Sequence, residues 1–536
     1  MKNLLLFVFA IPVMVFSQPL TIQWQKCLGG TLGDDGYGIK QMADGNYLTC
    51  GGVISNDGDV SGNHSTEQDG WVVKLDSNGD LLWQRCYGGS LSESFYSLEL
   101  TVDGGFVVAG YGGSIDGDVT GTYGSGDDWI VNCDSSGNIL WQKCLGGSNE
   151  ESGITKISRT FDRGYIIISS TASPDHDVVG LHDTTWCTSC WDDWVVKLDS
   201  VGNIEWSRCY GGYWWDHGYS IVQTRDSGYV FVGSGLSDNG DVQGLHGATN
   251  GYGFFQDYWV VKINSTGMIE WQKCLGGTAD DVPFDISNTD DGGYILTGTT
   301  LSNDFDVSGN HSSNNYVDAW IVKLDSSGGI QWQKCLGGSW ADVGIKIMQT
   351  PDGGFLSLNY SESQDGDLSG NQPVAVDVWL VKLDPSGNIQ WQQCLGGSLL
   401  EGPNDMCLTS DGGLVYTGLT NSNDGDVSGN HGDYDVWVVK LSALPDGVNL
   451  PKNPITDFST YLSPSGSLKV NFFANGNEKV LLQFLDITGR SILQQSITVT
   501  AGLNNKEIQT APLARGIYLV RLESQNGSLV KKVSMN

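Results

Sequence analysis

Acidic side chains recur at fixed spacing in several glycine-rich loops of the sequence, and this spacing is that of a calcium-binding loop. In the segment that ends at Gly429, carboxylate or hydroxyl oxygens stand at positions 1, 3 and 5, glycine stands at position 6, and an aspartate falls at position 12. Oxygen ligands in this order begin the loop of an EF-hand. The sequence therefore predicts a calcium site made by Asp424, Asp426, Ser428 and Asp435.

A structural role is the alternative for these acids, because most of them return in every repeat of the chain. A side chain that is needed seven times usually supports the fold, here by accepting hydrogen bonds from loop amides or by capping the start of a strand. For the acids that follow each Gly-Gly pair, a second interpretation is that they lie around the mouth of the central channel. The aspartates before a strand tryptophan are Asp69, Asp127, Asp192, Asp257, Asp318, Asp377 and Asp435; the repeated histidines are His64, His182, His246, His311 and His431; the acids after Gly-Gly are Asp34, Asp35, Glu93, Glu150, Glu151, Asp216, Asp280, Asp281, Asp342 and Glu401.

Aromatic side chains cluster in three short segments in the middle of the chain, at residues 186–191, 213–217 and 252–255. Their flat faces suit stacking on a sugar or on the apolar surface of a partner, because rigid rings lose little conformational entropy on binding. The alternative is that they pack against one another and stiffen longer loops. The predicted ligand-binding residues are Trp186, Trp191, Tyr213, Trp214, Trp215, His217, Tyr252, Phe254 and Phe255.

The cysteines fall into two groups. Seven of the twelve occupy one position of the repeat, and equivalent positions in neighbouring blades are too far apart for a disulfide, so we expect small buried side chains. Cys187 and Cys190 form an isolated Cys-x-x-Cys without a helix to activate it, which favours a local disulfide in an oxidising compartment. A zinc site that includes His182 is the alternative.

The sequence contains none of the linear motifs of common enzyme classes, such as Gly-x-Ser-x-Gly, His-Glu-x-x-His, the P-loop or the dinucleotide fingerprint. We therefore expect a binding protein whose ligand is a glycan or another protein, with no catalytic residue and no cofactor besides calcium. An extracellular polysaccharide-active enzyme is the alternative, because a pair of catalytic carboxylates needs no linear motif. Such acids would have to break the repeat and face each other.

A long repeat positions all of these residues. The phrase Trp-Gln-Lys-Cys-Leu-Gly-Gly begins at Trp24 and returns in close variants six more times, with successive tryptophans 58 to 65 residues apart. Each period holds four strand-like runs, and tight turns such as Asp44-Gly45 join them. Four strands per period are typical of a β-propeller blade, so the sequence predicts an all-β fold.

The two ends of the repeated region each carry half of one hairpin. Residues 21–28 are a fourth strand without its third, and residues 436–441 are a third strand without its fourth. Pairing them closes the ring and removes the exposed sheet edges, which predicts seven blades within residues 18–441. Because strand direction alternates, the tight turns lie on one face and the long loops on the other. We expect the ligand on the long-loop face, at blades 3 and 4.

The repeat resembles the bacterial seven-bladed β-propeller repeat family (SBBP). The resemblance rests on Gly-Gly followed by an acid, then Asp-Gly-Gly-Tyr and Asp-x-Trp-Val-Val-Lys-Leu-Asp-x-x-Gly, and it covers residues 20–441. The family implies the propeller fold and an extracellular setting, but no single activity.

The start of the chain and its charge indicate an exported protein. Residues 1–17 hold one early cation, an apolar run and a small-residue cleavage site, as in a secretory signal peptide. No later stretch is apolar enough to span a membrane. The net charge of −34 argues against nucleic acid and anionic membranes as partners, and it suits cations.

The composition changes after residue 441. Residues 442–454 are expected to form a linker, and residues 455–536 a small β-sandwich domain. Residues 450–536 carry nine Lys and Arg against five Asp and Glu. The motifs of this region, in chain order, are Asn453-Pro454, Leu485-Asp486-Ile-Thr-Gly489-Arg490, Gly516-Ile-Tyr-Leu-Val-Arg-Leu522 and Val530-Lys-Lys-Val533.

These motifs resemble the type A sorting domain of the type IX secretion system. Leu450-Pro-Lys452 departs from the family, which usually has an aromatic residue there, and this leaves the start of the domain open. The resemblance implies a Bacteroidetes-type bacterium, passage through the periplasm, and the type IX machinery as a partner. It also implies that the domain is removed and that the protein is secreted or lies on the outer cell surface. A generic β-sandwich is the alternative.

Overall fold

The computed structural model describes most of the chain, and every regular element in the described part is a β-strand. No helix in this part is long and apolar enough to cross a membrane. The predicted signal peptide, residues 1–17, lies outside the described residues. The described residues are 20–124, 126–182, 190–247, 255–312, 315–368, 375–444, 455–462, 467–474, 478–486, 490–499, 502–509, 516–524 and 527–535.

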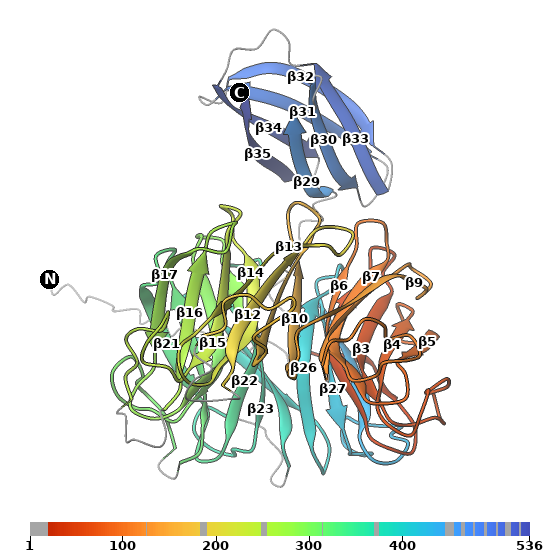
Figure 1. Cartoon of the computed structure of the whole chain (residues 1–536), viewed down its shortest axis with the longest axis vertical. Helices are drawn as coiled ribbons and strands as arrows, with labels where there is room; N and C mark the ends of the chain where they lie inside the picture. Colours follow the sequence, from red (N-terminus) through yellow and green to blue (C-terminus); the bar gives the residue numbers. More distant parts are fainter. Residues whose placement is uncertain are drawn as a thin grey trace, which may run out of the picture.

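Seven four-stranded antiparallel sheets form the blades of a propeller (Figure 1). Blades 1 to 3 are β2(Asp34–Gln41), β3(Tyr47–Val53), β4(Asp69–Leu75) and β5(Leu81–Tyr87); β6(Glu93–Leu100), β7(Phe106–Gly112), β8(Asp127–Cys133) and β9(Ile139–Leu145); β10(Glu151–Arg159), β11(Tyr165–Thr171), β12(Asp192–Leu198) and β13(Ile204–Tyr210). Blades 4 to 6 are β14(Asp216–Gln223), β15(Tyr229–Gly235), β16(Asp257–Ile263) and β17(Ile269–Leu275); β18(Asp281–Asn288), β19(Tyr294–Thr300), β20(Asp318–Leu324) and β21(Ile330–Leu336); β22(Asp342–Gln349), β23(Phe355–Ser361), β24(Asp377–Leu383) and β25(Ile389–Leu395). Blade 7 is β26(Glu401–Leu408), β27(Leu414–Thr420), β28(Asp435–Leu441) and β1(Ile22–Leu28).

Blade 7 closes the ring with strands from both ends of the repeated region. β1 pairs antiparallel with β28, from Ile22 opposite Leu441 to Leu28 opposite Val436. The amide of Thr21 also donates to Ser442 Oγ at 3.0 Å. The predicted pairing of residues 21–28 with residues 436–441 is therefore confirmed.

Tight turns join the first strand of a blade to its second and the third to its fourth. In blade 1, Gly45 (φ +87°) donates its amide to the carbonyl of Met42 at 3.0 Å, and Gly79 (φ +82°) donates to Asp76 at 3.0 Å. Glycine fits both turns because it adopts positive φ without a steric penalty. These turns share one face of the propeller, and the long loops between second and third strands lie on the opposite face with the connections between blades.

The first strands of the blades line the central axis, because each of them contacts the first strands of both neighbouring blades. The core lies between the blades and is dominated by the tryptophan of each third strand. In blade 1, Trp71 is 1% exposed and its indole N–H donates to Gln84 Oε1 at 2.7 Å. The buried third-strand tryptophans are Trp71, Trp129, Trp194, Trp259, Trp320, Trp379 and Trp437.

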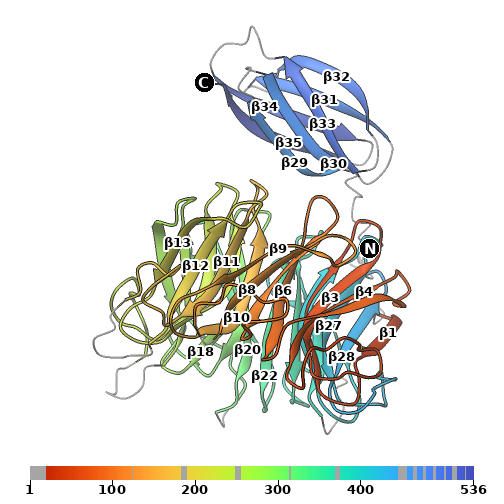
Figure 2. The same ribbon diagram turned by 45° about the vertical axis from the view of Figure 1, so that its right-hand side comes forward.

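The C-terminal strands form a separate body with its own core, drawn in blue in Figures 1 and 2. A three-stranded sheet and a four-stranded sheet pack around Phe472, Phe484 and Val520, which are fully buried. The alternating pattern of the sequence predicts strands at 469–473, 480–486, 492–499, 516–523 and 529–533, and the structure adds two more, at 455–462 and 502–509. The strands are β29(Ile455–Leu462), β30(Ser467–Ala474), β31(Glu478–Asp486), β32(Ser491–Val499), β33(Gly502–Gln509), β34(Gly516–Ser524) and β35(Gly527–Met535).

Candidate functional site

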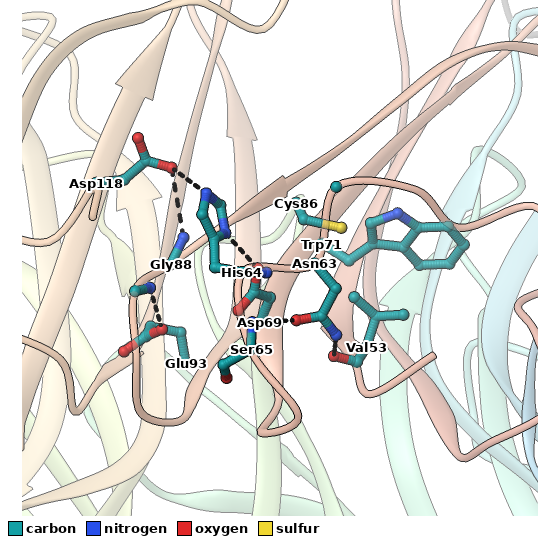
Figure 3. Close-up of polar contacts among 12 residues, drawn as sticks. Val53, Asn63, His64, Ser65, Asp69, Trp71, Cys86, Gly88, Glu93 and Asp118 are labelled. Carbon is teal, nitrogen blue, oxygen red and sulfur yellow. Dashed lines mark hydrogen bonds and ion pairs between the residues drawn. The ribbon is translucent and has the colours of Figure 1, made fainter. Parts of the chain in front are cut away.

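A histidine clasps neighbouring blades at five of the seven joints. At the joint between blades 1 and 2, His64 donates its amide to Asp69 Oδ2 at 3.0 Å, and its Nδ1 lies 2.5 Å from the same oxygen (Figure 3). On its other side, His64 Nε2 lies 3.8 Å from Asp118 Oδ2 of the next blade. The same double contact is made by His182, His246, His311 and His431. The expected structural role of these histidines, and of the aspartates as acceptors for loop amides, is confirmed.

The acid at the start of each first strand caps the connection between blades. Glu93 is fully buried; its Oε2 accepts the amide of Gly89 at 2.9 Å and its Oε1 accepts that of Ser114 at 2.8 Å. The acids that begin the first strands do not line the channel mouth, since all seven are at most 1% exposed and cap loop amides instead. Those seven are Asp34, Glu93, Glu151, Asp216, Asp281, Asp342 and Glu401. Of the other three acids in the predicted ring, Asp35 and Asp280 are partly buried and Glu150 is exposed, and their place at the channel mouth stays a prediction.

Two carboxyl groups converge at each joint, on either side of a glycine. A Cβ placed on Gly88 would lie 2.5 Å from Glu93 Oε2 and 2.8 Å from Asp69 Oδ1, so only glycine fits between the two acids. Asp69 Oδ1 is buried and accepts no hydrogen bond. Burial raises the pKa of Glu93 and of Asp69, and in the next joint it raises the pKa of Glu151 to about 7. The acid pairs at these two joints are therefore sensitive to protonation.

The four residues of the predicted calcium site are used in separate hydrogen bonds. Asp424 Oδ1 accepts the amide of Ser398 at 2.7 Å, and Asp426 Oδ2 accepts that of Gly396 at 3.2 Å. Ser428 accepts from a glutamine of the fourth strand, and Asp435 Oδ2 accepts the amide of a histidine. Within the described residues, no three His, Cys, Asp or Glu side chains form a group that could hold a metal ion. Calcium in this loop stays a prediction.

Part of the predicted aromatic site lies exposed on the long-loop face. Tyr213, Trp214 and Trp215, in the connection from blade 3 to blade 4, are 49%, 46% and 52% exposed. The rings of Trp191 and His217 lie 6.2 Å apart and are partly buried. Phe255 is 37% exposed. Trp186, Tyr252 and Phe254 lie outside the described residues.

The structure adds an apolar ring of which the sequence reasoning found only Trp214, and we call it the rim. It consists of the second residue after Gly-Gly in five blade connections, each about half exposed although it is large and apolar. The amide of each one donates to a serine hydroxyl, as from Trp340 to Ser363 Oγ at 3.0 Å, which fixes its position. The sevenfold arrangement places these residues around the axis. The rim residues are Leu32, Leu91, Trp214, Trp340 and Leu399.

Two buried acids break the repeat and were also missed. Asp128 and Asp193 stand next to the repeated aspartate on the third strands of blades 2 and 3, and both are at most 1% exposed. Asp128 Oδ1 accepts the hydroxyls of Thr155 and Ser169, whereas neither oxygen of Asp193 accepts a hydrogen bond. Burial raises the pKa of both well above the ordinary range. Comparing the blades residue by residue would have shown that other residue types occupy this position elsewhere.

The cysteines divide as expected. Cys190 is disulfide-bonded, and Cys187 lies outside the described residues. The other ten are free; six of the seven at the repeat position, such as Cys86 and Cys209, are buried between blades, and Cys394 is partly exposed. Burial raises the pKa of the Cys86 thiol to about 12, so this group is inert at neutral pH.

Comparison with known proteins gives one family match, at the C-terminus. Residues 464–536 match the model of the secretion system C-terminal sorting domain. No curated protein matches the chain. Similar solved structures include Sqt1 from Chaetomium thermophilum (11% identity, TM-score 0.40, covering 80% of this chain and 100% of that one) and a PL25 ulvan lyase (10%, 0.45, 78% and 98%). A third is YCF48 bound to D1 peptide (8%, 0.39, 81% and 100%).

The match fits both the fold and the sequence of this region. It begins inside the C-terminal body, and it covers the motifs at Leu485–Arg490 and Gly516–Leu522. A sorting domain of this kind directs export to the cell surface or release from the cell. The chain is therefore a seven-bladed β-propeller that carries the C-terminal sorting domain of the type IX secretion system.

Proposed function

We propose that the exported propeller is a binding protein that takes an extracellular glycan on its long-loop face, through the rim and the neighbouring aromatics Tyr213 and Trp215. The observation that carries this proposal is the rim itself. Five large apolar side chains are held half exposed at one repeat position on one face. Exposed apolar side chains lower the solubility of a protein, so their grouping on one face indicates an interaction site.

A glycan is favoured over a protein by the chemistry around the rim. Tryptophan faces stack on the C–H faces of sugars, and Trp214, Trp215 and Trp340 offer three such faces. Acidic loops surround them, and carboxylates accept hydrogen bonds from sugar hydroxyls. A protein partner is the other outcome that the test below separates.

An extracellular polysaccharide-active enzyme remains the alternative function, and it needs two opposed acids that break the repeat. Four acids of the described innermost strands break it: Asp35, Glu99, Asp285 and Asp405. Glu99 pairs with Lys40 at 3.4 Å, and Asp35 accepts a hydrogen bond from Tyr37. Asp285 and Asp405 both lie against Lys346, at 2.9 and 3.9 Å. They also accept the amides of Ile347 and Ile39 of the following blades. These contacts favour a role in joining blades over proton transfer.

The experiment is binding of the full chain to a panel of immobilised glycans, followed by a turnover assay on each glycan that binds. In the double variant Trp214→Ala/Trp215→Ala we expect affinity to fall by about tenfold or more, since buried aromatic anchors dominate such interfaces. Trp340→Ala should weaken binding as well. The control is Leu140→Ala, which removes an equally exposed apolar side chain (58%) from the outer strand β9.

Melting temperatures of all four proteins complete the test. We expect the variants to melt within about 2 °C of the parent, because exposed side chains contribute little to stability. Early melting of the tryptophan variants, or unchanged binding, would assign these residues to loop packing. Turnover of a bound glycan would establish the enzyme alternative, and binding only to proteins would exclude the glycan.

A further inference from the structure

The central channel contains a cavity of about 650 Å³ on the side of the long loops. Its wall comes from the first halves of the innermost strands, just below the connections that carry the rim. A second cavity, of about 940 Å³, lies at the tight-turn end and is lined by Lys40, Gln41 and Glu99 among others. The cavity below the rim, which we call the channel pocket, is lined by Tyr37, Tyr96, Lys156, His217, Tyr219 and Phe284 with four further residues.

Aromatic rings form two opposite walls of the channel pocket. Tyr37 and Tyr96 meet edge to face with ring centroids 5.0 Å apart, and Tyr219 and Phe284 do the same at 5.5 Å. The first pair belongs to blades 1 and 2 and the second to blades 4 and 5, so the pairs face each other across the axis. Two facing apolar walls suit a flat ring held between them.

Lys156 is the cation of the channel pocket that has no carboxylate partner. Three lysines stand on the innermost strands; Lys40 pairs with Glu99 at 3.4 Å, and Lys346 pairs with Asp285 at 2.9 Å. Among the described residues, no carboxylate lies within 4.0 Å of Lys156 Nζ, and this atom donates one hydrogen bond, to the carbonyl of Tyr96 at 3.4 Å. Two of its three N–H groups are thus left for a ligand.

At the strand position of Lys156 the charges of the channel wall balance, although the protein as a whole is acidic and the Asp35 carboxylate lies at the Tyr37 hydroxyl. At the strand position of Lys156, the other charged residues are Lys346, Asp285 and Asp405, so the four charges balance. Burial lowers the pKa of Lys156, with Asp405 and Asp285 opposing and Lys346 assisting that shift. An anionic group beside the ammonium would restore the charged form of Lys156.

From these contacts we infer that the channel pocket binds an acidic sugar residue, with its ring between the two aromatic walls and its anionic group on Lys156. Polar groups of the lining, among them His217, Ser170 and Asn404, can hydrogen-bond to sugar hydroxyls, which favours a sugar over an aromatic acid. The inference deepens the proposed function and rests on it for glycan binding at this face: the rim holds the chain of the glycan, and the pocket takes its acidic end.

The test is isothermal titration calorimetry of the full chain with glucuronate, glucose 6-sulfate and glucose. We expect one of the two anions to bind roughly tenfold or more tightly than glucose, since a charge-assisted hydrogen bond is worth about that much. The better anion identifies the group as carboxylate or sulfate. Lys156→Met should remove the preference over glucose, and Lys156→Arg should keep it.

The matched control is Lys143→Met, which removes an exposed lysine from the outer strand β9. It should bind both sugars as the parent does, and melting temperatures should show that both lysine variants are folded. Equal binding of anions and glucose by the parent, or an anion preference that survives Lys156→Met, overturns the inference.

The rim variants separate this inference from the proposed function. Trp214→Ala/Trp215→Ala should lose long glycans and keep the preference for the acidic monosaccharide. If the rim variants lose binding to long glycans but the parent shows no anion preference, the rim is supported as the glycan site and the channel pocket is excluded. If the parent prefers the anions but the rim variants bind long glycans normally, the channel pocket is supported and the rim is excluded as the glycan site.

Discussion

The joints between blades and the wall of the channel are built from the same strands, yet they follow opposite rules. At the joints, the acid–glycine–acid arrangement returns seven times and the histidine clasp five times, with nearly constant partners. Along the channel, one strand position holds Lys156, Asp285, Lys346 and Asp405 and smaller residues in the remaining blades. The comparison teaches that repetition at the joints marks what the fold requires, whereas departures from the repeat inside the channel are where we propose that a ligand is recognised.

Removing the closing strand β1 should have the largest effect on stability, because the ring of blades can then no longer close. Deletion of residues 20–28 takes away the partner of β28 and exposes its buried edge. We expect the cooperative thermal transition to broaden and to fall by at least about 10 °C, as measured by calorimetry.

The control deletion removes residues 455–536, whose core is separate from that of the propeller. It should leave the propeller transition unchanged. A similar loss in both deletions would mean that the blades do not depend on ring closure.

The acid pairs at the joints predict a loss of stability as the pH rises. Burial raises the pKa of Glu151, Asp216 and Asp281 to about 7 and that of Asp342 to about 6. A raised pKa in the folded state means that the stabilising form is the protonated one, present in full below about pH 4 and lost as the pH passes 7. Urea unfolding should give a lower free energy at pH 8 than at pH 5, by at least about 1 kcal/mol for each group.

Glu151→Gln sharpens this prediction, because the amide imitates the protonated acid at every pH. The variant should be more stable than the parent at pH 8 and close to it at pH 5. A stability that is constant or rises between pH 5 and pH 8 would show that the pairs are neutralised in another way.

The two irregular buried acids should respond in opposite directions, with the smallest effects. Asp193 accepts no hydrogen bond, so Asp193→Val should raise the free energy of unfolding by about 1 kcal/mol; Val378 and Val436 already occupy this position in blades 6 and 7. Asp128→Val should lower it by about 1–3 kcal/mol, because Thr155 and Ser169 would lose their acceptor. If both changes destabilise equally, the comparison between satisfied and unsatisfied acids fails.

Much of the fold follows from the sequence because each blade repeats the same local signals. Turn glycines, the buried tryptophan and the split hairpin predict the seven blades and their closure, and the structure confirms them. The strands at 455–462 and 502–509 were not predicted because apolar and polar residues do not alternate regularly along them; Asn504 and Asn505 lie in the middle of the second strand. Local pattern fails where tertiary pairing decides the strand.

The candidate sites were less predictable, for a geometric reason. The exposed Trp214 and Trp215 could be found as departures from the repeat, whereas Trp340 and Leu399 resemble ordinary loop residues until the fold places them on one face. The channel pocket combines residues from blades far apart in the chain, such as Tyr37 and Phe284. Sequence spacing carries no information on which side chains meet across an axis.

Ring closure also sets an order of events for the exported chain. The contact between Thr21 and Ser442 joins residues 421 positions apart, and contacts of such long range form slowly. The last blade stays incomplete until both of these segments are present in one chain, and the sorting domain follows directly after it. A chain cut short before β28 would therefore lack both the partner of the closing strand β1 and the export signal, so that a polypeptide that carries the signal also carries both halves of the closing hairpin.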